Sequence, residues 1–424
     1  MNVAAPAPAS ATALAIDGGT KAVTAAMPAW PVSGEIELQW MAEVVRSGQW
    51  SWLGPHERAF CDEFAGFIGA KHALLLANGT VTLQCALQAV GVEPGHEVIV
   101  PGLTWVATAQ AAFDIGADVV FADIDPESLC LSPEAFERAI TPRTRAVIPV
   151  HLYGCMADMD AIMAIARARG IKVVEDVAHQ HGSRWRDRCA GAIGDVGSFS
   201  MQQSKVLTCG EGGAVTTDSD EVREIVHCLK QVGWNPDGTP GNRYAHNYRA
   251  TEMQAVLLRG GLTRIAAQTR RREESAARLG AGLARLAGPL RVARRDPRIT
   301  RQAYYALTMH YDAAAAGVPR AAYIEALRAE GFPTHTPYWP VYRAPLMNLY
   351  HPTSPVPFRE RARMQDYANL RLPATERAVE ETAMLVAHQA LMGDDDYIDQ
   401  LLAAVRKVDD ALPRLRQRAA GAVA

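Results

Sequence analysis

The chain has 424 residues, of which 49% are hydrophobic and 21% charged, and its formal net charge is −3 at pH 7. This composition is that of a globular protein with two or three domains, and the near-neutral charge excludes an electrostatic reason to expect nucleic acid or an anionic membrane as a partner. No uncharged apolar stretch approaches the roughly 20 residues of a membrane span.

The N-terminal residues and the cysteines indicate a reduced, cytoplasmic setting. Residues 1–10 are rich in alanine and proline but lack the basic and apolar regions of a signal peptide, so we expect a flexible tail. The seven cysteines are scattered and contain no CxxC pair. That pattern favours reduced thiols over disulfides or a zinc site, and we expect no metal.

From residue 71 to residue 217 short apolar runs alternate with helix-like stretches. This alternation predicts an α/β fold with a doubly wound, mostly parallel sheet, in which ligands bind beyond the carboxyl ends of the strands. The predicted strands are 72–76, 97–100, 119–124, 146–152, 173–176, 196–201 and 214–217. The predicted helices are 81–90, 107–113, 133–140 and 159–169.

After residue 247 the pattern changes to a long arginine-rich helix and a smaller α+β unit. We predict a helix at 252–286, a strand at 303–311, a helix at 320–330, a Pro/Tyr-rich loop at 334–357 and helices at 359–370 and 395–411. The predicted organisation is an N-terminal tail and arm (1–35), a large domain that includes the long helix (36–286) and a small C-terminal domain (287–424).

Lys205 is the residue whose context is most informative. The chain contains only six lysines, and this one stands between an apolar run and the glycine-rich turn at 210–213. A lysine amine forms a Schiff base with a carbonyl only if burial or a cationic neighbour lowers its pKa, and arginine cannot replace it in that role.

Phosphate-binding features follow two of the predicted strands. Asn78, Gly79 and Thr80 open a helix, where free N–H groups and the helix dipole favour an anion, although ordinary helix capping explains the same residues. Ser200, five residues before Lys205, offers a hydroxyl to the same anion.

Three further residues at strand ends suit a flat heteroaromatic ring. Trp105 offers an aromatic face, with core packing as the alternative. Asp176 offers a carboxylate that would keep a pyridine nitrogen protonated, with helix capping as the alternative. His179 could reach a ring oxygen; metal binding by His179 and His181 competes, but a lone HxH lacks a third ligand. Together with Lys205 these residues indicate a site for pyridoxal 5′-phosphate (PLP).

With these motifs in view, the chain resembles the DegT/DnrJ/StrS family of sugar and cyclitol aminotransferases over nearly its whole length. The most specific segments are Asn78-Gly79-Thr80, Glu175-Asp176-Val-Ala-His179, the stretch from Ser198 to Gly213, and Asn247-Tyr248-Arg249 with Glu252-Met-Gln-Ala255. The resemblance implies a fold-type I aminotransferase with a seven-stranded sheet.

The resemblance also assigns roles to individual residues. It implies that Lys205 binds the PLP aldehyde, that Asp176 pairs with the pyridine nitrogen and that His179 lies near the phenolic oxygen. Gly79, Thr80 and Ser200 would hold the phosphate and Trp105 would stack on the ring. Asn247 would reach the phosphate of the neighbouring subunit, which implies a homodimer with a shared active site.

Within the family, residues 200–208 resemble the glutamine:scyllo-inosose aminotransferases of aminocyclitol antibiotic pathways, while residues 178–185 resemble the 3-amino-5-hydroxybenzoate synthases. We therefore expect transfer of an amino group from glutamine or glutamate to a keto-cyclitol or keto-sugar, with a hydroxybenzoate synthase and a non-catalytic PLP-binding regulator as alternatives. Relatives that perform 3-dehydration carry histidine in place of the lysine, and Lys205 argues against that chemistry. Loops that line the substrate in relatives carry Trp50, Trp52, His335, Tyr338, Tyr342 and Arg343, although aromatic packing at an interface explains them equally well.

Overall fold

The computed structural model describes residues 13–349, 351–354 and 366–421. Its centre is a seven-stranded sheet with the order β1-β9-β8-β5-β4-β2-β3. The other strands run parallel, whereas β9 runs antiparallel to both of its neighbours, which confirms the predicted mostly parallel sheet. In chain order the strands are β1 (His72–Leu76), β2 (Glu97–Pro101), β3 (Asp118–Ala122), β4 (Thr144–Val147), β5 (Lys172–Asp176), β8 (Val196–Ser200) and β9 (Gly213–Thr217).

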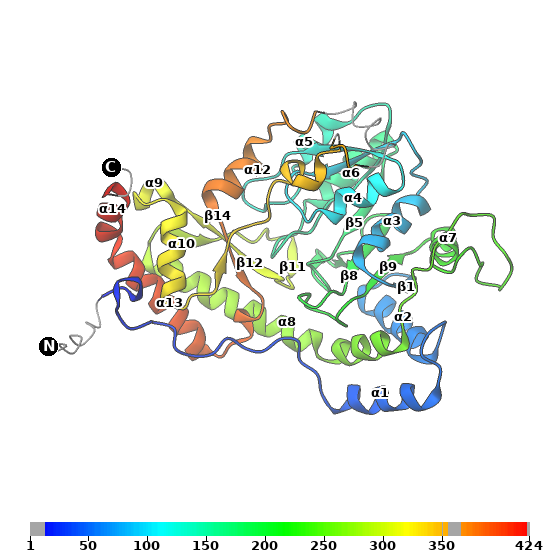
Figure 1. Cartoon of the computed structure of the whole chain (residues 1–424), viewed down its shortest axis with the longest axis horizontal. Helices are drawn as coiled ribbons and strands as arrows, with labels where there is room; N and C mark the ends of the chain where they lie inside the picture. Colours follow the sequence, from blue (N-terminus) through cyan, green and yellow to red (C-terminus); the bar gives the residue numbers. More distant parts are fainter. Residues whose placement is uncertain (1–12, 350, 355–365, 422–424) are drawn as a thin grey trace.

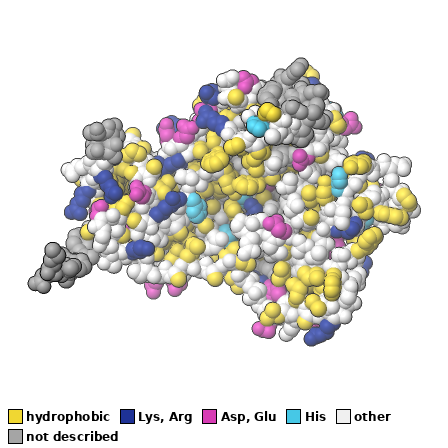
Figure 2. Space-filling view, in the orientation of Figure 1, with side chains coloured by type: hydrophobic (Ala, Val, Ile, Leu, Met, Phe, Trp, Pro, Cys, Tyr) yellow, Lys and Arg dark blue, Asp and Glu magenta, His cyan; other side chains and the backbone are white. Residues whose placement is uncertain are grey.

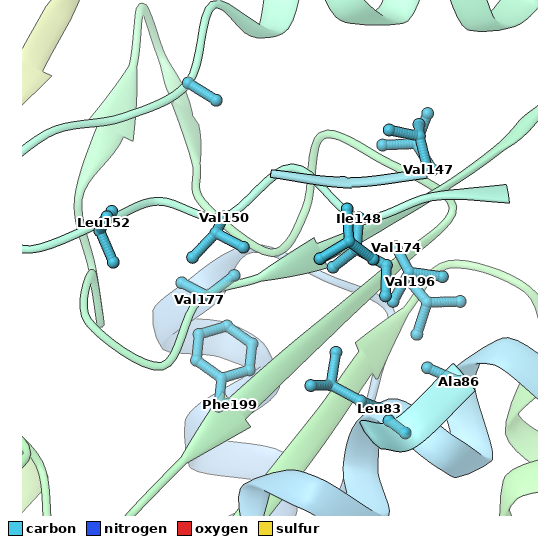
Figure 3. Packing of buried hydrophobic residues seen from close by; sticks show 14 of the residues in the cluster. Leu83, Ala86, Val147, Ile148, Val150, Leu152, Val174, Val177, Val196 and Phe199 are labelled. Carbon is cyan, nitrogen blue, oxygen red and sulfur yellow. The ribbon is translucent and has the colours of Figure 1, made fainter. Parts of the chain in front are cut away.

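Helices cover this sheet and bury its apolar side chains. Figure 3 shows Leu83 and Ala86 of α3 beside Val174, Val196 and Phe199 of the central strands. These side chains are all buried, as expected for parallel strands that are covered on both faces. The helices of this part of the chain are α1 (Glu35–Ser47), α2 (Pro55–Ile68), α3 (Gly79–Ala89), α4 (Ala107–Asp114), α5 (Pro133–Ala139), α6 (Met159–Arg169) and α7 (Asp220–Lys230).

The long helix α8 (Glu252–Leu286) has the predicted bounds and runs across the lower part of the molecule in Figure 1, above α1. It begins at a capping box formed by Thr251 and Gln254, and it ends where Ala287 adopts a left-handed conformation. It packs on α1 and α2, and also on α13 (Asp395–Asp410) near the C-terminus. It therefore links the parallel sheet to the C-terminal part of the chain.

The C-terminal part is built on a second, antiparallel sheet with the order β10-β12-β14-β13. Its strands are β10 (Leu290–Val292), β12 (Ala306–Tyr311), β13 (Thr334–His335) and β14 (Ala383–Ala387). A third small sheet joins β11 (Ile299–Arg301), β6 (Arg184–Trp185) and β7 (Arg188–Cys189). Among the described residues, the remaining α-helices are α9 (Ala313–Ala316), α10 (Arg320–Ala329), α12 (Pro373–Arg377) and α14 (Leu412–Gly421).

The buried hydrophobic residues form two clusters. The larger surrounds the parallel sheet, and the smaller lies between α8, β12, α10 and α13 and includes Leu14 and Val23 of the N-terminal arm. The domain boundaries stated above stay a prediction.

The predicted helix at 359–370 is partly wrong. Residues 359–365 of the predicted helix at 359–370 lie outside the described residues, and the described part, 366–370, contains a turn instead of a helix. Among the described residues, no helix is long and apolar enough to cross a membrane.

Candidate active site

The start of α3 and the end of β8 form a tight junction. The Asn78 side chain accepts hydrogen bonds from the N–H groups of Thr80 and Val81, each at 3.0 Å. A Cβ added to Gly79 would lie 2.6 Å from the Cβ of Ser200, so only glycine fits there without a shift. Asn78 therefore caps the helix as expected, and Gly79 lets the helix start approach Ser200.

The loop that carries Lys205 is held closed at its base. The N–H of Met201 donates to the carbonyl of Gly212 at 2.8 Å, and the N–H of Gln203 donates to the carbonyl of Gly210 at 2.7 Å. Gly210 has a φ of +87°, which glycine adopts without strain. Lys205 is only 9% exposed, and burial lowers the pKa of its amine to about 8, while the nearby Asp176 carboxylate acts in the opposite direction.

Asp176 ends β5 and is also buried. Its carboxylate accepts a hydrogen bond from the hydroxyl of Thr108 at 2.9 Å and from the N–H of Ala178 at 3.1 Å. Burial raises the pKa of the carboxyl, while these hydrogen bonds and the positive charge of Lys205 act to lower it. The two charged groups of the site thus influence each other directly.

His179 lies parallel to the ring of Tyr305, with ring centroids 3.8 Å apart and an angle of 10° between the planes. Its Nδ1 accepts the N–H of Tyr153 at 3.1 Å, so the neutral ring carries its proton on Nε2, 3.4 Å from the hydroxyl oxygen of Tyr338. Burial lowers the pKa of His179 well below its usual range, which keeps the ring neutral. The amine of Lys205 lies 4.6 Å from the Tyr305 ring centroid.

Trp105 joins this group through Tyr338. The two rings have centroids 5.3 Å apart, and the Trp105 side chain is 56% exposed, so it is not part of the core. An exposed aromatic face at the end of β2 is available for stacking.

His181 contacts the end of β8. Its Nε2–H donates to the carbonyl of Ser200 at 2.9 Å, and burial lowers its pKa to about 3. Within the described part of the chain no cluster of three metal-ligating side chains occurs.

The six predicted substrate residues fall into three places. His335 and Tyr338 line a cavity of about 180 Å³ beside Tyr305. The Tyr342 hydroxyl donates to Glu376 at 2.9 Å, and Arg343 forms ion pairs with Glu376 and Glu380, so the polar groups of both residues are already engaged.

Trp50, Trp52 and Asn247 lie on the surface of this chain. Trp50 is 52% and Trp52 is 54% exposed, and Asn247 is exposed as well. The guanidinium of Arg249 lies 5.0 Å from the Trp52 ring centroid, and the backbone N–H of Arg249 donates to the Asn247 side-chain oxygen at 3.3 Å. Arg249 therefore connects Trp52 with Asn247 at this surface.

Sequence reasoning missed Tyr305 and Thr108. Tyr305 belongs to the C-terminal part of the chain, just before β12, yet it contacts His179 and Lys205. Its neighbours in sequence give no functional signal. Thr108 was included in a predicted helix, and only the fold shows that its hydroxyl faces Asp176.

The family model of the DegT/DnrJ/EryC1/StrS aminotransferase family matches residues 31–405. The chain belongs to this family. It is 39% identical to a putative L-glutamine:3-amino-2,3-dideoxy-scyllo-inosose aminotransferase of Streptoalloteichus tenebrarius, over 95% of this chain and 99% of that protein. It is also 39% identical to an L-glutamine:2-deoxy-scyllo-inosose aminotransferase of the same organism, over 93% of this chain and 97% of that protein.

Solved structures agree with this membership. The crystal structure of 3-amino-5-hydroxybenzoic acid synthase matches this aminotransferase-family chain with a TM-score of 0.81 and 31% sequence identity, over 92% of this chain and 99% of that chain. The seven-stranded sheet and the position of Lys205 after β8 are thus set in an aminotransferase fold.

Proposed function

We propose that this protein is a PLP-dependent aminotransferase that moves the amino group of L-glutamine to the ring ketone of a cyclitol such as 2-deoxy-scyllo-inosose or scyllo-inosose. The observation that carries the proposal is the buried amine of Lys205, whose pKa is lowered to about 8, beside the buried carboxylate of Asp176. The two relatives named above, each 39% identical over more than nine-tenths of the chain, support the choice of donor and acceptor.

The residues of the site suit PLP. The contact between Gly79 and Ser200 leaves no room for a Cβ, and it lies at a helix N-terminus, where phosphate binds readily. Thr80 and Ser200 would add hydroxyl donors to the phosphate, Asp176 would accept the pyridine N–H, and Trp105 would stack on the ring. When bound, PLP supplies an electron sink that stabilises negative charge at the reacting carbon.

The amine of Lys205 then carries out the proton transfers. With a pKa of about 8, roughly a tenth of the amine is neutral at pH 7 and able to accept a proton, whereas an ordinary lysine is almost entirely protonated. In the donor half-reaction Nζ of Lys205 would remove the proton from the Cα of glutamine, water would supply the ketone oxygen of 2-oxoglutaramate, and the amino group would stay on the bound cofactor for the acceptor. In the acceptor half-reaction the steps reverse, and Nζ returns a proton to the ring carbon that gains the amine.

His179 and Tyr305 keep this amine in place. The neutral His179 ring presents its Nε2–H to an oxygen acceptor, and it stacks on the ring that also contacts Lys205. The two residues thereby restrict the positions that Nζ can occupy.

A homodimer is part of the proposal. Figure 2 shows hydrophobic side chains gathered at the lower right, where Figure 1 places α1. Leu38 and Val45, seven residues apart on that helix, are 62% and 53% exposed, and Trp50 follows them. Such a surface favours burial against another protein chain. We propose that a second copy covers it and that the partner subunit's Asn247 completes the phosphate site.

We also propose that the enzyme acts in the cytoplasm. Support comes from the cysteines, all seven of which lie within the described residues and are unpaired.

The test follows the cofactor by absorbance. The purified protein with PLP should show the band of a lysine–PLP imine, lose it on addition of L-glutamine, and regain it on addition of 2-deoxy-scyllo-inosose. Replacing Lys205 with alanine should abolish turnover. An absorbance band that does not change on addition of amino donors would favour a PLP-binding regulator. Release of an aromatic product would favour a 3-amino-5-hydroxybenzoate synthase. No band in the presence of PLP would refute the proposal.

A further inference from the structure

A small cavity lies next to the amine of Lys205. It has a volume of about 180 Å³, and its wall includes Ser204, the residue before Lys205, and Tyr305, whose ring centroid is 4.6 Å from Nζ. The volume corresponds to about six water molecules. One six-membered ring or part of it suits this space, whereas a nucleotide does not.

Two residues that line the cavity each carry a buried polar atom with no hydrogen-bond partner among the described residues. These atoms are Oε1 of Gln389 and Nδ1 of His388. The Nε2–H of His388 donates to the carbonyl of Ser204 at 2.9 Å, so the neutral ring has a bare lone pair on Nδ1. Burial lowers the pKa of His388 to about 3, which keeps the ring neutral. Both atoms therefore lack a hydrogen-bond donor, and leaving buried acceptors without one is unfavourable.

The rest of the wall is aromatic and uncharged. Tyr153, Tyr305 and Tyr338 contribute rings, and none of the described lining residues is a lysine, an arginine, an aspartate or a glutamate. A carboxylate gains no ion pair in such a space, so the cavity does not suit the carboxylate of an amino acid donor. It suits an uncharged molecule that offers hydroxyl donors around an apolar ring.

We propose that this cavity binds the hydroxyl-bearing edge of the acceptor cyclitol, with Gln389 and His388 accepting hydrogen bonds from ring hydroxyls. The proposal rests on the function proposed above and adds two specificity-determining residues that neither the sequence nor the family assignment indicates. It also explains why two buried acceptors are left without partners in the protein alone.

The decisive variant is Gln389→Leu, which keeps the approximate size of the side chain and removes the acceptor. The two half-reactions are measured separately by stopped-flow absorbance, with L-glutamine for the first and 2-deoxy-scyllo-inosose for the second. We expect kcat/KM of the acceptor half-reaction to fall roughly 5- to 30-fold, as for the loss of one buried hydrogen bond, while the donor half-reaction changes less than about 2-fold. The loss should appear mainly in KM.

Gln302→Leu is the matched control. Gln302 is 3% exposed and its Oε1 also lacks a partner, but it does not line this cavity. The control should leave the ratio of the two half-reactions unchanged, which separates loss of recognition from a general effect of replacing a buried glutamine.

A second measurement does not depend on turnover. Calorimetric titration with scyllo-inositol, which has no ketone to react, should show binding to the wild-type protein and to Gln302→Leu, and weaker binding to Gln389→Leu. Equal affinities for all three proteins, or a defect confined to the glutamine half-reaction, would overturn the proposal. If the wild-type protein does not react with glutamine at all, the proposed function fails, while the scyllo-inositol titration still decides whether the cavity binds polyols.

Discussion

Replacing Lys205 with methionine should stabilise the protein in the absence of PLP. The amine has a pKa of about 8 in the folded chain, against 10.5 for an ordinary lysine, because burial disfavours its charged form. The folded state therefore binds fewer protons than the unfolded state between these two values, and the stability of the wild-type protein rises as the pH increases from 8 to 10.5. Below pH 8 the full cost of the buried charge is present, and it amounts to about 3 kcal/mol.

The assay is urea unfolding of the PLP-free protein at a fixed protein concentration, followed by tryptophan fluorescence. Lys205→Met should unfold with a free energy higher than the wild type by up to about 3 kcal/mol at pH 7, and the difference should disappear near pH 10.5. Lys21→Met is the control, because Lys21 is exposed and its replacement should change stability by less than about 0.5 kcal/mol at either pH.

Two results would refute this reasoning. If the two proteins had the same stability at pH 7, the amine of Lys205 would not be a desolvated cation, and its suitability for imine formation would need another cause. If the stabilisation were the same at pH 7 and pH 10.5, it would come from packing of the methionine side chain instead of removal of a charge.

Three further predictions concern the neighbours of Lys205. Gly79→Ala forces a Cβ against Ser200, so it should lower the free energy of unfolding in urea by about 1–3 kcal/mol and weaken PLP binding in a fluorescence titration. Gly66→Ala in α2 is the control: its Cβ meets open space, so it should leave the stability unchanged or raise it. Asp176→Asn removes a negative charge that favours protonated Lys205, so the pKa of the amine should fall further. The pH dependence of Lys205 acetylation in the PLP-free protein measures this pKa, and an unchanged pH dependence would contradict the interaction between the two residues. Tyr305→Phe should keep the ring contact with His179, whereas Tyr305→Leu should lower the free energy of unfolding by about 0.5–1.5 kcal/mol. Equal losses of stability in the two variants would show that the stacked ring is unimportant.

Most of the fold could be predicted because its elements are specified locally. The bounds of α8 follow from a strong cap at Thr251 and an unbroken helical pattern to Leu286. The central strands were placed within a few residues because each is a short apolar run between turns. Of the strand predicted at 146–152, β4 includes only the part up to Val147, because Pro149 has no N–H to donate, and pairing with β5 resumes as a bridge between Val150 and Asp176.

The candidate site was only partly accessible from the sequence. Lys205, Asp176 and Gly79 follow strands of one sheet, so the rule that ligands bind at the carboxyl ends of strands places them together. Tyr305 and Gln389 come from the antiparallel sheet and its connections, and the packing of that sheet against the loop of Lys205 has no local signature. Residues brought by a second layer of structure need the fold before they can be recognised.

The histidines around the site do not contribute to its charge near pH 7. His179, His181 and His388 are all buried, and burial lowers the pKa of each below its usual range. One ring nitrogen of each histidine also forms a hydrogen bond with the backbone, as an acceptor in His179 and as a donor in the other two, and this bond fixes the neutral tautomer. Near pH 7 these three imidazoles therefore carry no charge, and they neither repel a protonated lysine nor compete with it for protons. The site consequently combines the amine of Lys205 and the carboxylate of Asp176 with uncharged imidazoles, an arrangement that lets the amine exchange protons with a substrate carbon while the histidine contacts stay constant.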